Sequence, residues 1–207
     1  MEYKEYKECI QREFQYITKD NILFWNLWNI SYPFDVLATY KEAYPEEYTL
    51  FSEMYFSCWE MLYQVDEKRE VLVSVFEQTY PFVIDEQGEI INLKNVLQQK
   101  YESYDDEILP ELCILLLIGR FDEIYKGIKQ KAERYGERAI NAPMEVISYI
   151  IASYKWGYLF DNMDKSIVRD EVNAQMKLVK TLQTPRLFSL EDRNIFRNKQ
   201  YFIKANC

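Results

Sequence analysis

The sequence of 207 residues contains no histidine. Histidine is the usual general base near neutral pH and a frequent zinc ligand, so its absence excludes His-ligated zinc sites and nucleophiles activated by an imidazole. Glycine is also scarce, and the 5 glycines are too scattered to form a loop that cradles phosphates. The sequence offers no recognisable catalytic set, and we predict that the protein is not an enzyme.

Cysteines and long apolar runs are equally scarce. The 4 cysteines form no CxxC pair, which argues against a disulfide framework and a metal site: Cys9, Cys58, Cys113 and Cys207. The longest apolar run, Leu112 to Ile118, is far shorter than the ~20 residues of a membrane helix. The charged N-terminus lacks the apolar region of a signal peptide. We expect a cytoplasmic protein with no cofactor, no metal and no membrane partner.

Apolar residues are abundant, and they recur with the period of an α-helix. Apolar residues make up 48% and aromatic residues 16% of the chain, which is typical of a globular protein. Their spacing predicts an all-α fold, a single multi-helix domain spanning residues 1–207. One small β-hairpin is expected near residues 82–92, where two β-branched runs flank Glu86-Gln87-Gly88.

Prolines and glycines predict where the helices begin and end. Pro33, Pro45 and Pro143 suit the first turn of a helix, and Gly119 suits a turn between two helices. Residues 110–119 align with residues 143–152 at a shift of 33, a period found in stacked helical hairpins. Stacked hairpins are therefore one possible architecture.

The net charge of −9 is unevenly spread. Residues 1–110 carry 9 basic and 22 acidic side chains, a net −13, whereas residues 111–207 carry 16 and 12, a net +4. An acidic half repels nucleic acid and attracts basic proteins, so we expect a basic protein partner and no nucleic acid. The alternative is that the acidity serves solubility.

Two acidic patterns indicate where such a partner binds. Glu46, Glu53, Glu60 and Glu67 are spaced by seven and would share one face of a continuous helix. Residues 40–48 and 101–107 mix tyrosines with carboxylates at expected helix junctions. Tyrosine is a frequent interface anchor, and carboxylates pair with lysine and arginine. The predicted partner-binding residues are Tyr44, Glu46, Glu47, Tyr48, Glu53, Glu60, Tyr101, Tyr104, Asp105, Asp106 and Glu107.

Simpler explanations exist for each pattern. Glutamates keep the outer face of an amphipathic helix in water, and acids near a helix start interact favourably with its positive end. Asp105-Asp106-Glu107 lacks the spacing of acidic metal motifs, although a metal-dependent hydrolase stays a third possibility. The basic and aromatic C-terminus suits single-stranded nucleic acid or, as we prefer, docking on the acidic half: Arg186, Arg193, Arg197, Lys199 and Lys204.

In size, acidity, helical pattern, Tyr- and Glu-rich N-terminus and lack of a catalytic set, the chain resembles the helical immunity proteins of bacterial contact-dependent growth inhibition and polymorphic toxin systems. The resemblance covers the whole chain in character and involves no family motif, so no family residue is carried over. It implies stoichiometric binding of a cognate toxin domain, often a basic nuclease, whose active site or substrate groove is blocked. The alternative function is a helical-repeat scaffold or regulator that binds a peptide or partner helix.

Overall fold

The computed structural model describes residues 1–62, 82–84, 90–93, 103–105, 107–129 and 137–198. Its α-helices are α1 (Tyr3–Phe14), α2 (Ile22–Thr39), α3 (Pro45–Met61), α6 (Leu109–Lys129), α7 (Glu137–Ser153) and α8 (Ser166–Thr181). Short 3-10 helices are η1 (Lys19–Asn21), η2 (Leu159–Asn162) and η3 (Leu190–Asn194). The predicted all-α class is confirmed.

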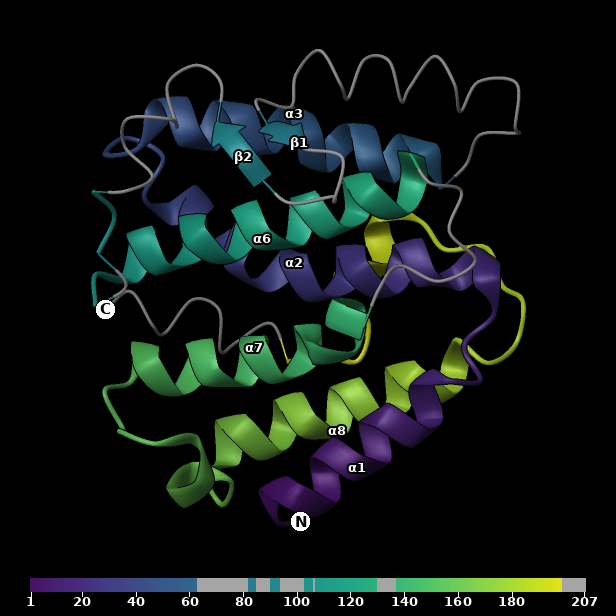
Figure 1. Cartoon of the computed structure of the whole chain (residues 1–207). Coiled ribbons are helices and arrows are strands. Elements are labelled where there is room, and N and C mark those ends of the chain that lie inside the picture. Colours follow the sequence, from purple (N-terminus) through teal and green to yellow (C-terminus); the bar gives the residue numbers. More distant parts are fainter. Residues whose placement is uncertain (63–81, 85–89, 94–102, 106, 130–136, 199–207) are drawn as a thin grey trace.

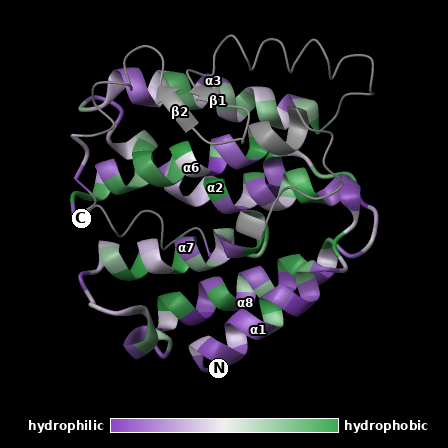
Figure 2. Cartoon of the chain, in the orientation of Figure 1, coloured by the Kyte–Doolittle hydropathy of each residue, from purple (hydrophilic) through white to green (hydrophobic). Residues whose placement is uncertain are grey.

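The helices form a stack with α3 at one edge and α1 with α8 at the opposite edge (Figure 1). Helix α2 lies in the middle and packs against α3, α6 and α7, while α7 also packs against α8. Helices α1 and α8 come from opposite ends of the sequence and lie side by side. The outermost helices therefore need only one apolar face, and both α1 and α8 mix hydrophilic and hydrophobic residues in Figure 2.

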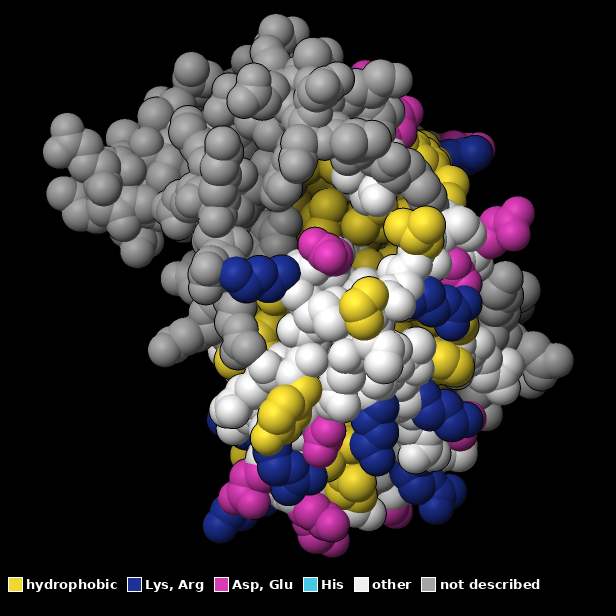
Figure 3. Space-filling view, turned by 90° about the vertical axis from the view of Figure 1, so that its right-hand side faces the viewer, with side chains coloured by type: hydrophobic (Ala, Val, Ile, Leu, Met, Phe, Trp, Pro, Cys, Tyr) yellow, Lys and Arg dark blue, Asp and Glu magenta, His cyan; other side chains and the backbone are white. Residues whose placement is uncertain are grey.

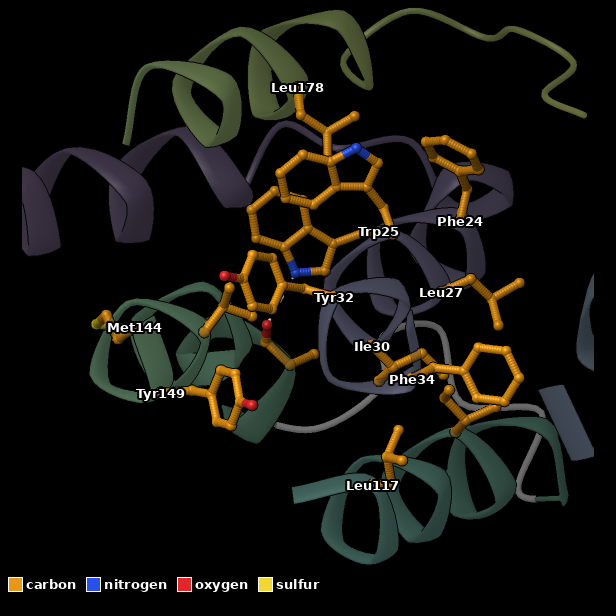
Figure 4. Packing of buried hydrophobic residues seen from close by; sticks show 14 of the residues in the cluster. Phe24, Trp25, Leu27, Ile30, Tyr32, Phe34, Leu117, Met144, Tyr149 and Leu178 are labelled. Atoms are coloured by element: carbon orange, nitrogen blue, oxygen red, sulfur yellow. Dashed lines mark hydrogen bonds between the residues drawn. The ribbon is translucent and has the colours of Figure 1, made fainter. Parts of the chain in front are cut away.

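Helix α2 is buried almost all round because its apolar side chains point in every direction (Figure 4). Trp25 and Trp28 are fully buried, and the Trp25 indole N–H donates to the Ala139 carbonyl of α7 at 2.9 Å. Buried Asn26 and Asn29 donate back to carbonyls four residues earlier, which supplies hydrogen bonds that water cannot. This helix is the centre of the core.

Three predicted helix boundaries are wrong. Pro33 lies inside α2, Pro143 lies inside α7, and α6 continues through Gly119. An interior proline costs ~3 kcal/mol and an interior glycine ~1 kcal/mol. Buried apolar side chains in the same helices offset those costs, for example Phe34 after Pro33, Phe121 after Gly119 and Ile147 after Pro143, because a fully buried Leu, Ile or Phe contributes ~1.5–3 kcal/mol. The predicted start of α3 at Pro45 is confirmed.

The proposed 33-residue similarity is matched by burial and not by helix boundaries. Ile114 of α6 and Ile147 of α7 are both fully buried. Pro110, however, stands in the first turn of α6, whereas Pro143 stands inside α7. The two helices bury equivalent positions of the alignment, but they begin at different positions of it.

Two short strands complete the described secondary structure. Strand β1 (Phe82–Ile84) pairs antiparallel with β2 (Ile90–Leu93), and Phe82 lies opposite Leu93. The pairing falls where the sequence places a hairpin. Within the described part of the chain, no helix combines the length and apolar character needed to cross a bilayer.

Candidate functional site

The two acid–tyrosine segments of the sequence meet in one place. Tyr44 precedes the first residue of α3, and Glu46 and Glu47 lie in its first turn. Glu111 lies in the first turn of α6. A hollow of about 430 Å³ opens between them, which we call the acid–tyrosine hollow, and its described lining consists of Ala43, Tyr44, Pro45, Glu46, Glu47, Ser103, Tyr104 and Glu111.

Hydrogen bonds tie the two segments together. The Tyr104 hydroxyl donates to Glu47 Oε1 at 3.0 Å, and the Tyr44 hydroxyl donates to Glu111 Oε1 at 3.2 Å. The backbone N–H of Asp105 also donates to Glu111 Oε2. Each segment thus supplies a tyrosine whose hydroxyl donates to a carboxylate on the opposite side of the hollow. These hydrogen bonds hold the two sides of the hollow together.

Burial and the neighbouring carboxylates raise the pKa of both tyrosines. Burial, followed by the negative charge of Glu47, raises the pKa of Tyr104 above its ordinary value. Burial, followed by Glu111, raises the pKa of Tyr44 in the same way. A phenol that resists ionisation remains a hydrogen-bond donor, so the arrangement persists through the physiological pH range.

Part of this acidity serves helix capping, as the simpler explanation requires. Asp105 Oδ1 accepts the backbone N–H of Glu107 at 2.8 Å just before α6. Glu46, Glu47 and Glu111 occupy first turns, where a negative charge is stabilised by the helix dipole. Capping accounts for the positions of these carboxylates, and it is compatible with a second role for those that face solvent.

The predicted site residues separate into exposed and buried groups. Exposed carboxylates at this end of the stack, which we call the acidic edge, are Glu46, Glu53, Glu60, Asp105 and Glu107. Glu47 is only 2% exposed, and Tyr48 is half-buried with its ring 6.0 Å from that of Phe34. Tyr101 and Asp106, like Glu67 of the glutamate stripe, lie outside the described residues.

The C-terminal arginines have partners away from the acidic edge. Arg193 pairs with Asp35 of α2 at 3.3 Å. Arg197 pairs with Glu171 of α8 at 2.8 Å, and Arg186 lies 3.8 Å from Asp192. The C-terminal segment therefore lies on α2 in the acidic half, but of these three arginines Arg193 alone pairs with a carboxylate of that half, and Glu53 and Glu60 of α3 stay exposed. Lys199 and Lys204 lie outside the described residues.

Positive charge is prominent at the opposite edge of the stack. Arg169, Lys177 and Lys180 are exposed on the outer side of α8. In Figure 3, lysine and arginine side chains recur over the lower half of the face, away from α3, with acidic side chains between them. Helix α3 therefore exposes glutamates and contains no lysine or arginine, whereas the edge formed by α1 and α8 exposes cations mixed with carboxylates such as Glu5, Glu8 and Asp164.

Sequence reasoning missed Glu111, which accepts hydrogen bonds from both Tyr44 and Asp105. The available signal was its position directly after Pro110, because proline suits the first turn of a helix and acids are favoured there. In the described residues, no group of three or more Cys, Asp or Glu side chains is placed to hold a metal ion.

Comparison with known proteins finds no family model, no curated protein and no solved structure that matches this chain.

Proposed function

We propose that the protein binds a cognate toxin domain, a basic nuclease, through the acidic edge and neutralises it stoichiometrically. The observation that supports this most directly is the meeting of the two acid–tyrosine segments beside the exposed glutamates of α3. The C-terminal arginines pair with other carboxylates, so they do not neutralise Glu53 and Glu60.

Binding would begin with electrostatic attraction. Glu53 and Glu60 are exposed and project a negative field that accelerates encounter with a basic partner. Close charge pairs at an interface can contribute about 1.5–7 kcal/mol of coupling energy, which is enough for a tight complex. Tyr44 and Tyr104 then offer ring surface at low entropic cost because their hydroxyls are already held by Glu111 and Glu47.

Inhibition follows from the same chemistry. A nuclease binds the phosphate backbone with lysine and arginine side chains. Carboxylates on the acidic edge would form ion pairs with those lysine and arginine side chains and so exclude the nucleic acid substrate. Glu47 has a different role here, because it is buried and holds Tyr104 in place.

The test compares two charge-reversal variants of the full chain. One replaces α3 glutamates, Glu53→Lys with Glu60→Lys, and the matched control replaces α8 cations, Lys177→Glu with Lys180→Glu. Each protein is used to co-purify partners from the source cell, and the recovered basic protein is assayed for nuclease activity and titrated with the inhibitor. We expect one equivalent of wild type to abolish the activity, the α3 variant to bind at least tenfold more slowly, and the α8 variant to act like wild type.

The salt response supplies the decisive outcome. Association of wild type should slow at least tenfold between low and high ionic strength, because exposed charges are screened. If the α3 variant inhibits the same nuclease at the wild-type rate, or if the recovered partner has no toxic or nuclease activity, the proposal is wrong.

A second candidate function rests on exposed aromatic residues at η2. Tyr158 is 81% exposed and Phe160 is 67% exposed, and the Phe160 ring meets that of Tyr3 edge-on at 4.8 Å. Large exposed aromatic residues grouped together favour docking of a peptide or partner helix. Such a complex would be weakened by Phe160→Ser and would depend little on salt, which separates it from the charge-led complex.

A further inference from the structure

The segment from Leu187 to Arg197, which we call the C-terminal strap, lies across the central helix α2. The Phe188 ring stacks on Phe24 with centroids 3.9 Å apart. The Trp28 indole N–H donates to the Ile195 carbonyl at 2.9 Å. The strap thus covers aromatic residues that belong to the core.

The strap ends at a buried arginine, Arg197. The Arg197 guanidinium donates to both carboxylate oxygens of Glu171 and, through Nη1, to the Trp28 carbonyl at 2.6 Å. Its central carbon lies 3.3 Å from the centre of the Trp28 ring and 5.7 Å from that of Tyr32. We call Trp28, Tyr32 and Glu171 the guanidinium slot.

The chemistry of this slot suits a guanidinium and not an ammonium. A planar fork can donate two hydrogen bonds to one carboxylate while its face stacks on an indole. A lysine ammonium is a compact and strongly hydrated charge, and its burial here would leave acceptors unsatisfied. The slot also borders a cavity of about 20 Å³, room for about one water molecule, so its walls are not closed tightly around Arg197.

The strap has the construction of a unit that can detach. The backbone N–H groups of Asp192, Ile195 and Arg197 donate within the strap, at 2.8, 2.8 and 3.0 Å, so in the described part of the chain its backbone is held to the stack by one accepted hydrogen bond, from the Trp28 indole to the Ile195 carbonyl. Just upstream, the Asn21 side chain holds the Thr184 carbonyl, which fixes the chain before the strap begins. Leu187, at the junction, is 89% exposed, so its side chain contributes little contact that would fix the junction to the stack.

Backbone strain at one residue favours opening. Phe196 has a φ of 71°, in the left-handed region that is unfavourable for a bulky side chain, and its ring is 40% exposed. Such a conformation persists only when the surrounding contacts enforce it. Here the enforcing contact is the neighbouring Arg197 in its slot.

We infer that the C-terminal strap is a clasp that opens independently of the helix stack, and that the guanidinium slot is a binding site whose resident ligand is Arg197. When the clasp opens, the slot is available to a guanidinium group from solution. This inference does not depend on the proposed inhibition of a toxin, because it involves neither the acidic edge nor the acid–tyrosine hollow.

The first experiment is chemical rescue of Arg197→Ala. Removing the guanidinium leaves Glu171 buried without its cation, so we expect a lower Tm than wild type. Ethylguanidinium should restore most of the lost Tm, whereas ethylammonium, which has the same charge and no fork, should not. If Arg197→Ala does not fold alone, refolding yield in the two salts replaces Tm. Equal effects of the two cations, or no rescue by either, would overturn the binding site.

The second experiment measures opening in the unmodified protein by native-state hydrogen exchange. We expect the amides of Asp192, Ile195 and Arg197 to exchange together and faster than those of α2, which report global unfolding. Phe196→Gly removes the backbone strain and should slow this exchange about fivefold, because glycine adopts the left-handed region without the steric clash that a Cβ makes there. Leu187→Gly, the matched control without positive φ, should not slow it. Exchange of the strap only with α2, or no effect of Phe196→Gly, would overturn the clasp.

Discussion

The Tyr104 hydroxyl donates a 3.0 Å hydrogen bond to Oε1 of Glu47, a carboxylate that is only 2% exposed. The two residues are 57 positions apart, and each belongs to a segment that the sequence marks by its mixture of tyrosines and acids. Their contact turns two separate patterns into one surface feature. It also removes Glu47 from the set of carboxylates that a partner can reach.

Tyr104→Phe tests this relationship. The buried Glu47 carboxylate would lose a donor, and the expected destabilisation is about 1–2 kcal/mol, measured from the urea midpoint at unchanged m-value. Tyr44→Phe is the matched control, because its acceptor Glu111 is half-exposed and water can replace the lost donor. Equal losses of stability in the two variants would contradict the assignment of Glu47 as the buried member.

Asn21→Ala should loosen the junction between α2 and the end of α8. The Asn21 amide donates to the Leu182 and Thr184 carbonyls, both at 2.9 Å, and is buried. Its removal deprives the Thr184 carbonyl of its donor, whereas the Leu182 carbonyl keeps the backbone N–H of Thr18 at 3.1 Å, so we expect a loss of about 1–2 kcal/mol in thermal or urea unfolding. Asn173→Ala, on the exposed side of α8, should change stability by less than ~0.5 kcal/mol.

Gly119→Ala should stabilise the protein. Gly119 lies inside α6, and a Cβ built there meets nothing within 4 Å, so alanine gains helix propensity of about 0.5–1 kcal/mol without a clash. Gly157→Ala is the contrasting variant, because a φ of 86° strains any residue with a Cβ and should lower Tm. A destabilising Gly119→Ala would instead support the turn expected from the sequence.

Stability should fall steeply at alkaline pH. Burial raises the pKa of the Cys113 thiol from an ordinary 9.0 to about 12. Between these values the unfolded chain releases a proton that the folded chain keeps, so the free energy of unfolding decreases as pH rises. Burial likewise raises the pKa of Tyr6 and of Tyr149, which adds to the fall above their ordinary 10.0.

The measurement is the urea midpoint at several pH values above neutrality. Cys113→Ala should reduce the slope of stability against pH between about pH 9 and 12, whatever its effect on stability at neutral pH. Asn173→Ala, which removes no titratable group, should leave the slope unchanged. An unchanged slope in Cys113→Ala would contradict the burial of an unionised thiol.

The sequence by itself determined the helical class, the start of α3 at Pro45 and the exposure of Glu46, Glu53 and Glu60. These properties depend on local spacing: a 3.6-residue period decides which side chains share a face, and proline suits a first helical turn wherever it occurs. The two acid–tyrosine segments were also visible, because composition alone marks them.

The tertiary structure decided what those local signals could not. Pro33, Pro143 and Gly119 are helix breakers in isolation, and they lie inside helices here because buried apolar side chains in the same helices offset their cost. The contact of Tyr104 with Glu47 and the insertion of Arg197 beside Glu171 join residues distant in sequence. No periodicity encodes such pairings, because they depend on how whole helices stack and on which buried polar groups require a partner.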